Sequence, residues 1–350
     1  RTLVVALMMM GVATTLIGLL PTYDSIGLAA PLCLVLLRFI QGLAVGGQWG
    51  GAMLLVTESA PADKRGWYGA YAQAGAPMGV ILANLAFISV SASMSDEAFL
   101  AWGWRLPFIA SILLIAISLY IQLRMEDTEA FKALQAEQAA SPQQAVAERS
   151  PVFEAMRRYP RRILLAAGAF LSVQVTFYIL IAFVIAYGLN SPTVDLTRDE
   201  LLVSVLVAAA IMMPAQFYFS GLSDRVGRKQ IYRWGAILTG IWGFAIFPLV
   251  DTGMPIMITL AVTMGMVLLG MQYGPQAAYF TELFATEVRY SGASLGYQIG
   301  AILGGALAPT IAVLLWQELG IIYVSVYILV AALLTLWCLS QLEETGGKAL

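Results

Sequence analysis

Arg38 carries a charge that folding alone does not explain. It lies in an apolar stretch between Pro31 and Gly51, and a charge near the centre of a membrane-length segment costs about 2.5 kcal/mol or more. Chains keep such a charge mainly where it faces a partner, a cavity or a substrate. On a helix, Gln41 and Gln48 share roughly one face with Arg38. This face could bind an anionic group or a carboxylate of another helix, or Arg38 could form a structural pair near the outer face of the membrane.

Other polar side chains interrupt further apolar stretches. Gln272 and Gln276 lie four residues apart and therefore share a helical face. The Gly274-Pro275 pair between them frees backbone hydrogen-bonding groups, which is typical of a bend that lines a cavity. The alternative is hydrogen bonding between packed helices. The same two interpretations apply to a wider set of residues, Tyr273, Gln73, Gln174, Tyr178, Tyr297 and Gln298.

The composition indicates a polytopic membrane protein. Of 350 residues, 60% are hydrophobic and only 11% are charged, whereas a soluble domain carries about 25% charged residues. The mean hydropathy is +0.80. There is no histidine, and Cys33 and Cys338 lie in apolar segments, so a disulfide framework and a metal-ligand spacing are excluded. No phosphate-cradling loop, nucleophile–base pair or buried carboxylate pair is present. We expect no enzyme, cofactor, metal or nucleic-acid partner.

Ten apolar stretches are long enough to cross a bilayer as helices, which takes about 20 residues each. They cover approximately 3–20, 29–56, 67–92, 102–123, 163–188, 201–220, 232–250, 255–280, 291–316 and 320–341. The connections at 21–28, 93–101, 189–200, 251–254 and 317–319 contain a single basic residue, Arg198. The other connections are rich in lysine and arginine, so the positive-inside rule places them, and both visible ends, in the cytoplasm.

The longest connection divides the chain. We predict a partial N-terminal bundle of four helices at 1–124, a cytoplasmic linker at 125–162, a C-terminal six-helix bundle at 163–341 and a cytoplasmic tail at 342–350.

The two parts contain an internal repeat. Thr57-Glu58 and Thr281-Glu282 are each followed, after six residues, by an arginine, Arg65 or Arg289. A glycine-rich span follows in both cases. Such repeats are typical of secondary transporters built from two similar bundles around a central site. If the two halves are alike, six spans precede the linker, and we expect two further spans before residue 1.

Several motifs together resemble one family. Gly221–Lys229, which contains Asp-Arg-Val-Gly-Arg, resembles the signature loop of the major facilitator superfamily. Four more segments, Arg38–Ala52, Ala101–Phe108, Met125–Phe131 and Phe280–Gly292, are similar to its metabolite:proton symporter family, which includes shikimate, α-ketoglutarate, citrate and proline/betaine carriers. The resemblance covers the whole chain. It implies a major facilitator fold with two pseudo-symmetric bundles, of which the ten visible spans are helices 3–12 of 12.

The resemblance also implies a proton-coupled carrier, with one departure. Family members usually have glutamate where this chain has Gln48, and the acidic residue usual in helix one precedes the visible sequence. No Asp or Glu lies at the centre of a visible span, although a membrane-embedded carboxylate is the usual proton carrier. Coupling therefore rests on the missing helices or is weakened here.

Basic residues at the predicted cytoplasmic helix ends agree with the positive-inside rule whatever their further role. Pairs of basic and acidic residues there could also close the cytoplasmic side during transport. The candidates for this gating role are Glu58, Arg65, Asp224, Arg225, Arg228, Glu282, Glu287 and Arg289.

We therefore predict a monomeric secondary transporter in a bacterial inner membrane. It would import a small polar metabolite, an organic acid, by proton symport with alternating access. Two alternatives remain: an uncoupled facilitator or exchanger with the same fold, favoured by Gln48, and a non-transporting membrane sensor or structural protein, which would need no polar cavity.

Overall fold

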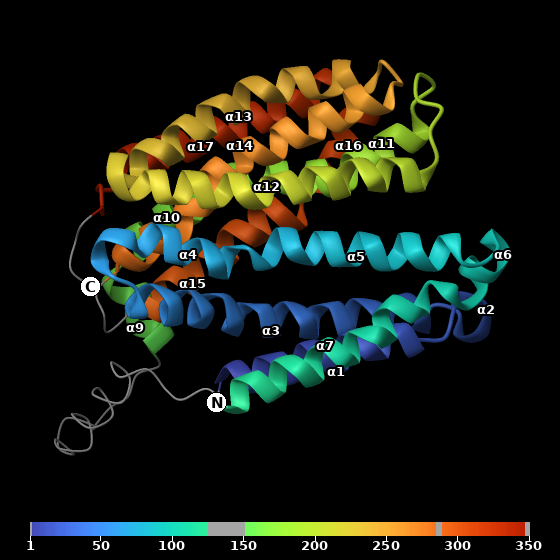
Figure 1. Ribbon diagram of the computed structural model, residues 1–350, viewed down its shortest axis with the longest axis horizontal. Helices are drawn as coiled ribbons and strands as arrows, with labels where there is room; N and C mark the ends of the chain where they lie inside the picture. The colour runs from blue at the N-terminus through green and yellow to red at the C-terminus, as the bar shows by residue number, and fades with distance from the viewer. Residues whose placement is uncertain (1, 125–150, 285–288, 347–350) are drawn as a thin grey trace. The chain divides into compact units, whose positions relative to one another are not determined.

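The computed structural model describes residues 2–124, 151–284 and 289–346, and within these ranges every regular element is helical (Figure 1). The first part contains α1 (Thr2–Leu19), α2 (Tyr23–Ile26), α3 (Ala29–Ser59), the turn η1 (Ala62–Lys64), α4 (Arg65–Gln73), α5 (Gly75–Ala92), α6 (Asp96–Ala98), η2 (Phe99–Gly103) and α7 (Arg105–Arg124). The second contains α9 (Pro151–Arg158), α10 (Pro160–Tyr178), η4 (Ile179–Phe183), α11 (Val184–Asn190), α12 (Arg198–Val226), α13 (Arg228–Val250) and α14 (Pro255–Glu282). The third contains α15 (Arg289–Gly300), η5 (Ala301–Ala306), α16 (Ala308–Glu318) and α17 (Ile322–Gln341).

The described helices have the lengths of membrane spans. Eight helical segments are long and apolar enough to cross a bilayer, and a pair bent by 51°, Asp96–Gly103 with Arg105–Ile117, adds a ninth when counted as one span. A shorter apolar helix covers Val5–Leu19. These segments coincide in position with the ten predicted spans, so the prediction of an all-α polytopic membrane protein is confirmed for the described residues.

The chain forms two compact units, one comprising 1–52 and 82–148, the other 53–81 and 149–350. The second unit therefore includes the end of α3, the whole of α4 and the start of α5 together with the C-terminal helices. The domain boundaries predicted from the sequence stay a prediction.

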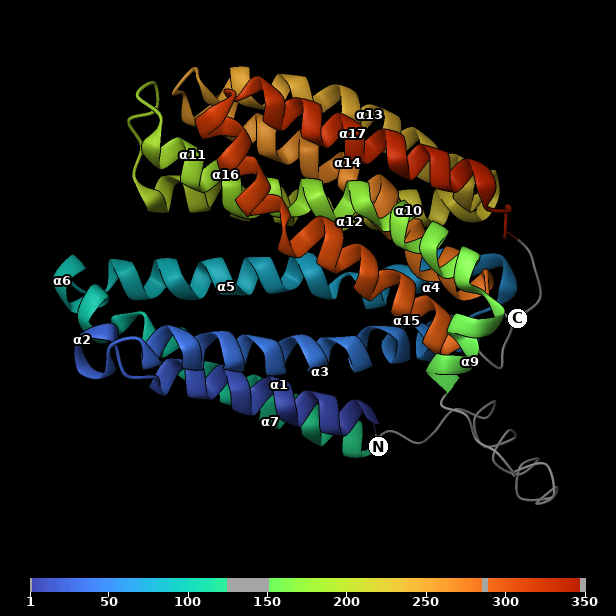
Figure 2. The same ribbon diagram turned by 180° about the vertical axis from the view of Figure 1, so that it is seen from behind.

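Within the first unit, α1 and α7 lie side by side (Figures 1 and 2). Arg105 at the start of α7 caps the C-terminal end of α1. Its Nη1 donates hydrogen bonds to the carbonyl oxygens of Gly18 at 3.1 Å and Leu20 at 2.6 Å. Gly18 is among the last four residues of α1, whose carbonyls have no partner within the helix, and Leu20 follows α1 directly. Its guanidinium also lies 4.8 Å from the ring centroid of Trp104.

Within the second unit, α14 packs against α12 and α13, and α10 packs against α15 and α17 (Figures 1 and 2). Small residues permit the close approach of α15 to α10. A Cβ atom built on Gly296 or Gly300 would lie within 2.9 Å of Ala166 or Phe170. Small residues at four-residue spacing are typical of packed membrane helices, so this glycine ladder serves packing.

The turn between α12 and α13 positions the charged residues of the signature loop. Helix α12 begins with a capping box formed by Thr197 and Glu200 and ends before Gly227. Gly227 has φ of 111°, a value that favours glycine. The chain therefore turns within one residue, and Asp224 and Arg228 face each other across the turn.

Candidate functional site

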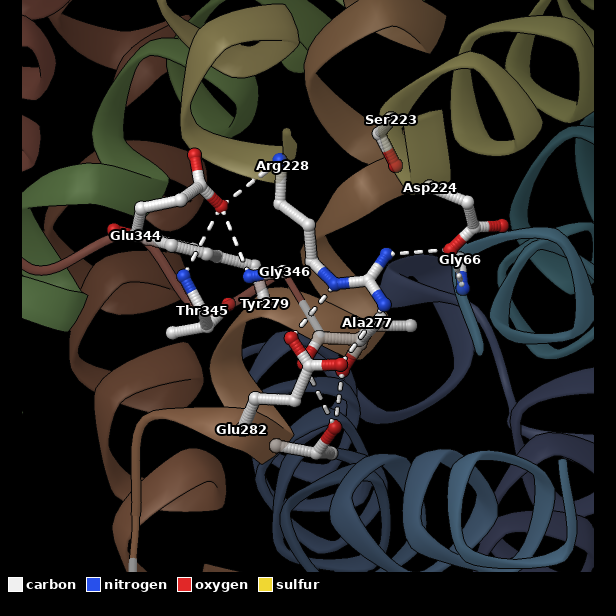
Figure 3. Close-up of polar contacts among 12 residues, drawn as sticks. Gly66, Ser223, Asp224, Arg228, Ala277, Tyr279, Glu282, Glu344, Thr345 and Gly346 are labelled. Carbon is white, nitrogen blue, oxygen red and sulfur yellow. Dashed lines mark hydrogen bonds and ion pairs between the residues drawn. The ribbon is translucent and has the colours of Figure 1, made fainter. Parts of the chain in front are cut away.

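Asp224 binds the N-terminus of α4. Its Oδ1 accepts a hydrogen bond from the backbone N–H of Gly66 at 2.8 Å, and its Oδ2 accepts one from Trp67 at 2.9 Å (Figure 3). The first N–H groups of a helix lack intrahelical partners and favour a negative charge. The Ser220 hydroxyl donates to the Gly66 carbonyl at 2.6 Å. We call these hydrogen bonds of Gly66, Trp67, Ser220 and Asp224 the docking contact.

The docking contact requires glycine at position 66. A Cβ atom there would lie 2.7 Å from Asp224 Oδ1, from Arg228 Nη1 and from the Ser220 carbonyl oxygen. Two of these atoms belong to a hydrogen-bonded ion pair and the third is backbone, so none can move cheaply. Any larger residue would separate α4 from α12.

Arg228 joins two carboxylates in the interior of the second unit. Its Nη1 lies 2.9 Å from Asp224 Oδ1, while Nε and Nη2 lie 2.7 and 2.8 Å from the two oxygens of Glu282 (Figure 3). This bidentate geometry is the strongest form of an arginine–carboxylate pair. The exposed fractions of the Arg228, Asp224 and Glu282 side chains are 1%, 6% and 0%. We call these three residues the buried ion cluster.

The chain after α17 closes the other side of Arg228. Glu344 accepts hydrogen bonds from the backbone N–H groups of Arg228 and Lys229, each at 3.0 Å, and from those of Thr345 and Gly346 at 3.0 and 3.1 Å (Figure 3). A glutamate from the end of the chain thus caps the N-terminus of α13.

A second ion pair connects the two sequence repeats. Arg289 Nη1 lies 3.4 Å from Glu58 Oε1, and Arg289 Nε donates to the Phe284 carbonyl at 3.2 Å. The glutamate of the first repeat therefore pairs with the arginine of the second. Of the other candidate gating residues, Arg65 is buried, Arg225 is exposed, and Glu287 lies outside the described residues.

Gln272 and Gln276 are fully buried and bind α13. Gln272 Nε2 donates to Thr239 Oγ1 at 2.8 Å, and Gln276 Nε2 donates to the Tyr232 hydroxyl. These contacts match the interhelical alternative. A role for the two side chains in a substrate cavity stays a prediction.

The remaining polar candidates of the second unit lie along α4, α10, α14 and α15. Gln73 Nε2 donates to the carbonyl of Tyr273 at 3.0 Å, and both residues are buried. The Tyr297 ring lies edge-on to Phe170. Gln174 and Tyr178 contact the glycines at the end of η5, and Gln298 is half-buried. The structure thus brings Gln73 of α4 into contact with Tyr273 of α14, although the two residues lie far apart in the sequence.

Arg38, Gln41 and Gln48 all lie on α3, within the first unit. Gln41 Nε2 donates to Thr14 Oγ1 of α1 at 2.7 Å, and Gln48 is half-buried. Arg38 is exposed, and no ion pair with it occurs in the part of the chain that the structure describes.

The family model of the Major Facilitator Superfamily matches residues 1–295. The chain belongs to this superfamily. It is 38% identical over 357 residues to the Escherichia coli inner membrane metabolite transport protein YhjE, covering 100% of this chain and 78% of that protein. It is 36% identical over 313 residues to the Escherichia coli shikimate transporter, covering 89% and 70%. Among solved structures, the proton:xylose symporter XylE aligns with a TM-score of 0.75 at 17% identity, covering 100% of this chain and 81% of that one.

These matches confirm the resemblance and the major facilitator fold. The protein is a multi-pass membrane transporter of the major facilitator type and not an enzyme. Within the described ranges, no group of three or more His, Cys, Asp or Glu residues could hold a metal ion.

The sequence did not predict the backbone partners of Asp224. The docking contact uses the N–H groups of Gly66 and Trp67, and a sequence pattern does not mark backbone donors. Glu344 was also missed, although two consecutive glutamates directly after the last span are a visible signal. Ser220, one helical turn before Asp224, carries no signal of its own.

We predict that Glu282→Gln destabilises the protein, because Arg228 would keep a buried charge with only one carboxylate partner. Breaking a buried ion pair costs about 3–5 kcal/mol, and the remaining Asp224 contact would reduce this loss. The melting temperature of the purified protein in detergent would show the effect.

The matched control for this experiment is Glu318→Gln, which removes the same charge at an exposed position of α16. The control is expected to melt like the wild type. Equal melting temperatures for Glu282→Gln and the wild type would contradict a stabilising role of the buried ion cluster.

Proposed function

We propose that this transporter imports a small organic acid by proton symport with alternating access. The observation that carries the proposal is the exposed side chain of Arg38 on the apolar helix α3, without an ion partner among the described residues. A charge in that position is costly unless an anion or a carboxylate faces it. The similarity to a transporter of shikimate, a carboxylic acid, supports an anionic substrate.

Gating would depend on the buried ion cluster and the docking contact. Residues 53–81 contact the C-terminal helices through hydrogen bonds, one ion pair and the packing of Trp67 and Tyr71 against Phe217. Polar contacts of this kind can break and re-form with little net change in free energy, because water replaces the lost partners. Opening of the predicted cytoplasmic side would separate α4 from α12 and Glu58 from Arg289.

Substrate recognition would use Arg38 and the glutamine and tyrosine residues of the candidate functional site. In this proposal Arg38 holds the negative group, and the glutamine and tyrosine side chains contact its polar periphery. Those that already have protein partners, such as Gln272, would contribute by fixing the helices that form the cavity. The protein would act as a monomer in a bacterial inner membrane, with the visible ends and the central linker in the cytoplasm.

A second candidate is an uncoupled facilitator or exchanger of the same fold. It is favoured by Gln48, which lacks the ionisable group expected at that position. In addition, the acidic residues of the described helices lie at or near helix ends, as Glu58, Asp224 and Glu282 illustrate.

We predict that a proton gradient drives accumulation of the substrate. Purified protein in liposomes, with an acidic exterior and a panel of labelled organic acids outside, is expected to accumulate one of them above its external concentration. Protons moving down their gradient would supply the free energy for this accumulation. The time course of internal label measures it.

A protonophore that collapses the gradient is the control, and it is expected to abolish accumulation while leaving equilibration intact. Uptake that reaches the same level with and without the gradient would contradict symport and support the uncoupled alternative.

We also predict that Arg38→Gln weakens substrate binding. A hydrogen bond to a charged group contributes about 1.5–3 kcal/mol, so KM for the transported acid is expected to rise about tenfold or more. Arg38→Lys should retain part of the affinity, because the charge remains. Initial uptake rates at varied concentrations measure KM.

The control for Arg38 is Arg157→Gln, an exposed arginine on α9, which should leave KM unchanged. A KM for Arg38→Gln equal to that of the wild type would remove Arg38 from the substrate site.

A further inference from the structure

Three polar residues of α12 at four-residue spacing bind α4. Asp224 and Ser220 belong to the docking contact, and Gln216 lies one helical turn before Ser220. Residues four apart share a helical face, so the three side chains form one row. With a rise of about 1.5 Å per residue, the row extends about 12 Å along α12. The polar contact between α4 and α12 therefore reaches well beyond the docking contact.

Gln216 binds the backbone of α4 with its amide nitrogen. Its Nε2 donates to the carbonyl oxygen of Ala70 at 3.3 Å, which is longer than the usual range for such a bond. The same carbonyl already accepts the backbone N–H of Ala74 at 2.8 Å. The reverse orientation of the amide would place two acceptor oxygens against each other, so the nitrogen must face Ala70. This contact therefore adds no more than an ordinary hydrogen bond to the docked arrangement.

The carbonyl oxygen of the same side chain is buried without a partner. Gln216 is 0% exposed, and its Oε1 has no hydrogen-bond partner among the residues that the structure describes. A buried acceptor that is left unpaired costs more than a typical hydrogen bond contributes. The Gln216 amide therefore weakens the docked arrangement through its oxygen more than it strengthens that arrangement through its nitrogen.

Helix α14 holds Gln216 in this position. A Cβ atom on Gly274 would lie 2.6 Å from the backbone carbonyl oxygen of Gln216, and one on Gly270 would lie 3.2 Å from its backbone nitrogen. The backbones of α12 and α14 are thus in direct contact at Gln216, which leaves its backbone little room to shift. When α4 separates, Gln216 stays with α12 and α14, and water can donate a hydrogen bond to its Oε1.

We propose that Gln216 is a positioning residue that limits the stability of the docked arrangement, so that α4 can separate from α12 during transport. Its oxygen is unpaired only while α4 is docked, and an interaction that differs between two states shifts their equilibrium. Burial of this oxygen therefore favours separation, and an apolar side chain of the same size would hold α4 more tightly. This role rests on the proposed gating, but it depends neither on the substrate nor on proton coupling.

Two substitutions at position 216 are expected to act in opposite directions. Gln216→Met removes both the weak contact and the unpaired oxygen while keeping the length of the side chain, so it should stabilise docking. Gln216→Asn keeps an amide but shortens the side chain by one carbon, so it should lose Ala70 and retain a buried unpaired group. Amide hydrogen exchange of Gly66 and Trp67 measures docking, because their N–H groups donate to Asp224 only while α4 is docked.

Exchange of the Gly66 and Trp67 amides is expected to be about two- to tenfold slower in Gln216→Met than in the wild type, and about two- to tenfold faster in Gln216→Asn. The backbone N–H groups of Arg228 and Lys229, which donate to Glu344 within the C-terminal part, are the internal control and should exchange at the wild-type rate. Gln317→Met, the same substitution at an exposed position of α16, should leave all four amides unchanged.

Unchanged or faster exchange of Gly66 and Trp67 in Gln216→Met would overturn the proposal, and so would equal slowing of all four amides, which indicates a general gain in stability. Slower exchange in Gln216→Asn would also overturn it. If Gln216→Met does not fold, Gln216→Leu serves with the same expectation. Exchange is measured on the full chain in detergent, without substrate or proton gradient, so a failure of the proposed symport would appear only in the liposome experiment.

Discussion

The buried guanidinium of Arg228 determines how the predicted cytoplasmic end of this transporter is built. An isolated charge in that position would be strongly unfavourable, so Asp224 and Glu282 must both lie against it. These two carboxylates belong to α12 and α14, and the sharp turn at Gly227 brings Arg228 of α13 between them. Once Asp224 is fixed in this way, its oxygens also face the N-terminus of α4, and the docking contact follows.

This arrangement connects stability with the proposed gating. The buried ion cluster lies within the C-terminal helices, whereas the docking contact and the Glu58–Arg289 pair join those helices to residues 53–81. Separation of α4 would thus expose Asp224 to water without removing Arg228 from its two carboxylates. The costly charge would stay paired in both states. Water can replace the polar contacts that separation breaks, whereas the packing of Trp67 and Tyr71 against Phe217 would be lost.

Hydropathy predicted the helices and their positions, because the bilayer imposes a minimum length of apolar sequence on each span. The repeat and the signature loop singled out these charged residues as a group, but not their partners, and their gating role stays a prediction. Glu58 pairs with Arg289 of the other repeat, and Asp224 binds backbone N–H groups of α4, contacts that depend on three-dimensional packing. For Gln272 the sequence allowed a cavity or an interhelical contact equally, since both need a polar side chain on a buried helix face.

In the proposed transport cycle, α4 docks on α12 in one state and separates from it in another. Distances between spin labels on Tyr68→Cys of α4 and Val226→Cys of α12, in a protein lacking Cys33 and Cys338, would test this separation directly. Both positions are exposed and lie within one unit. We predict a short distance that gains a longer population during transport and in Gly66→Ala, where the added methyl group prevents docking. A single unchanged distance under transport conditions and in Gly66→Ala would contradict it.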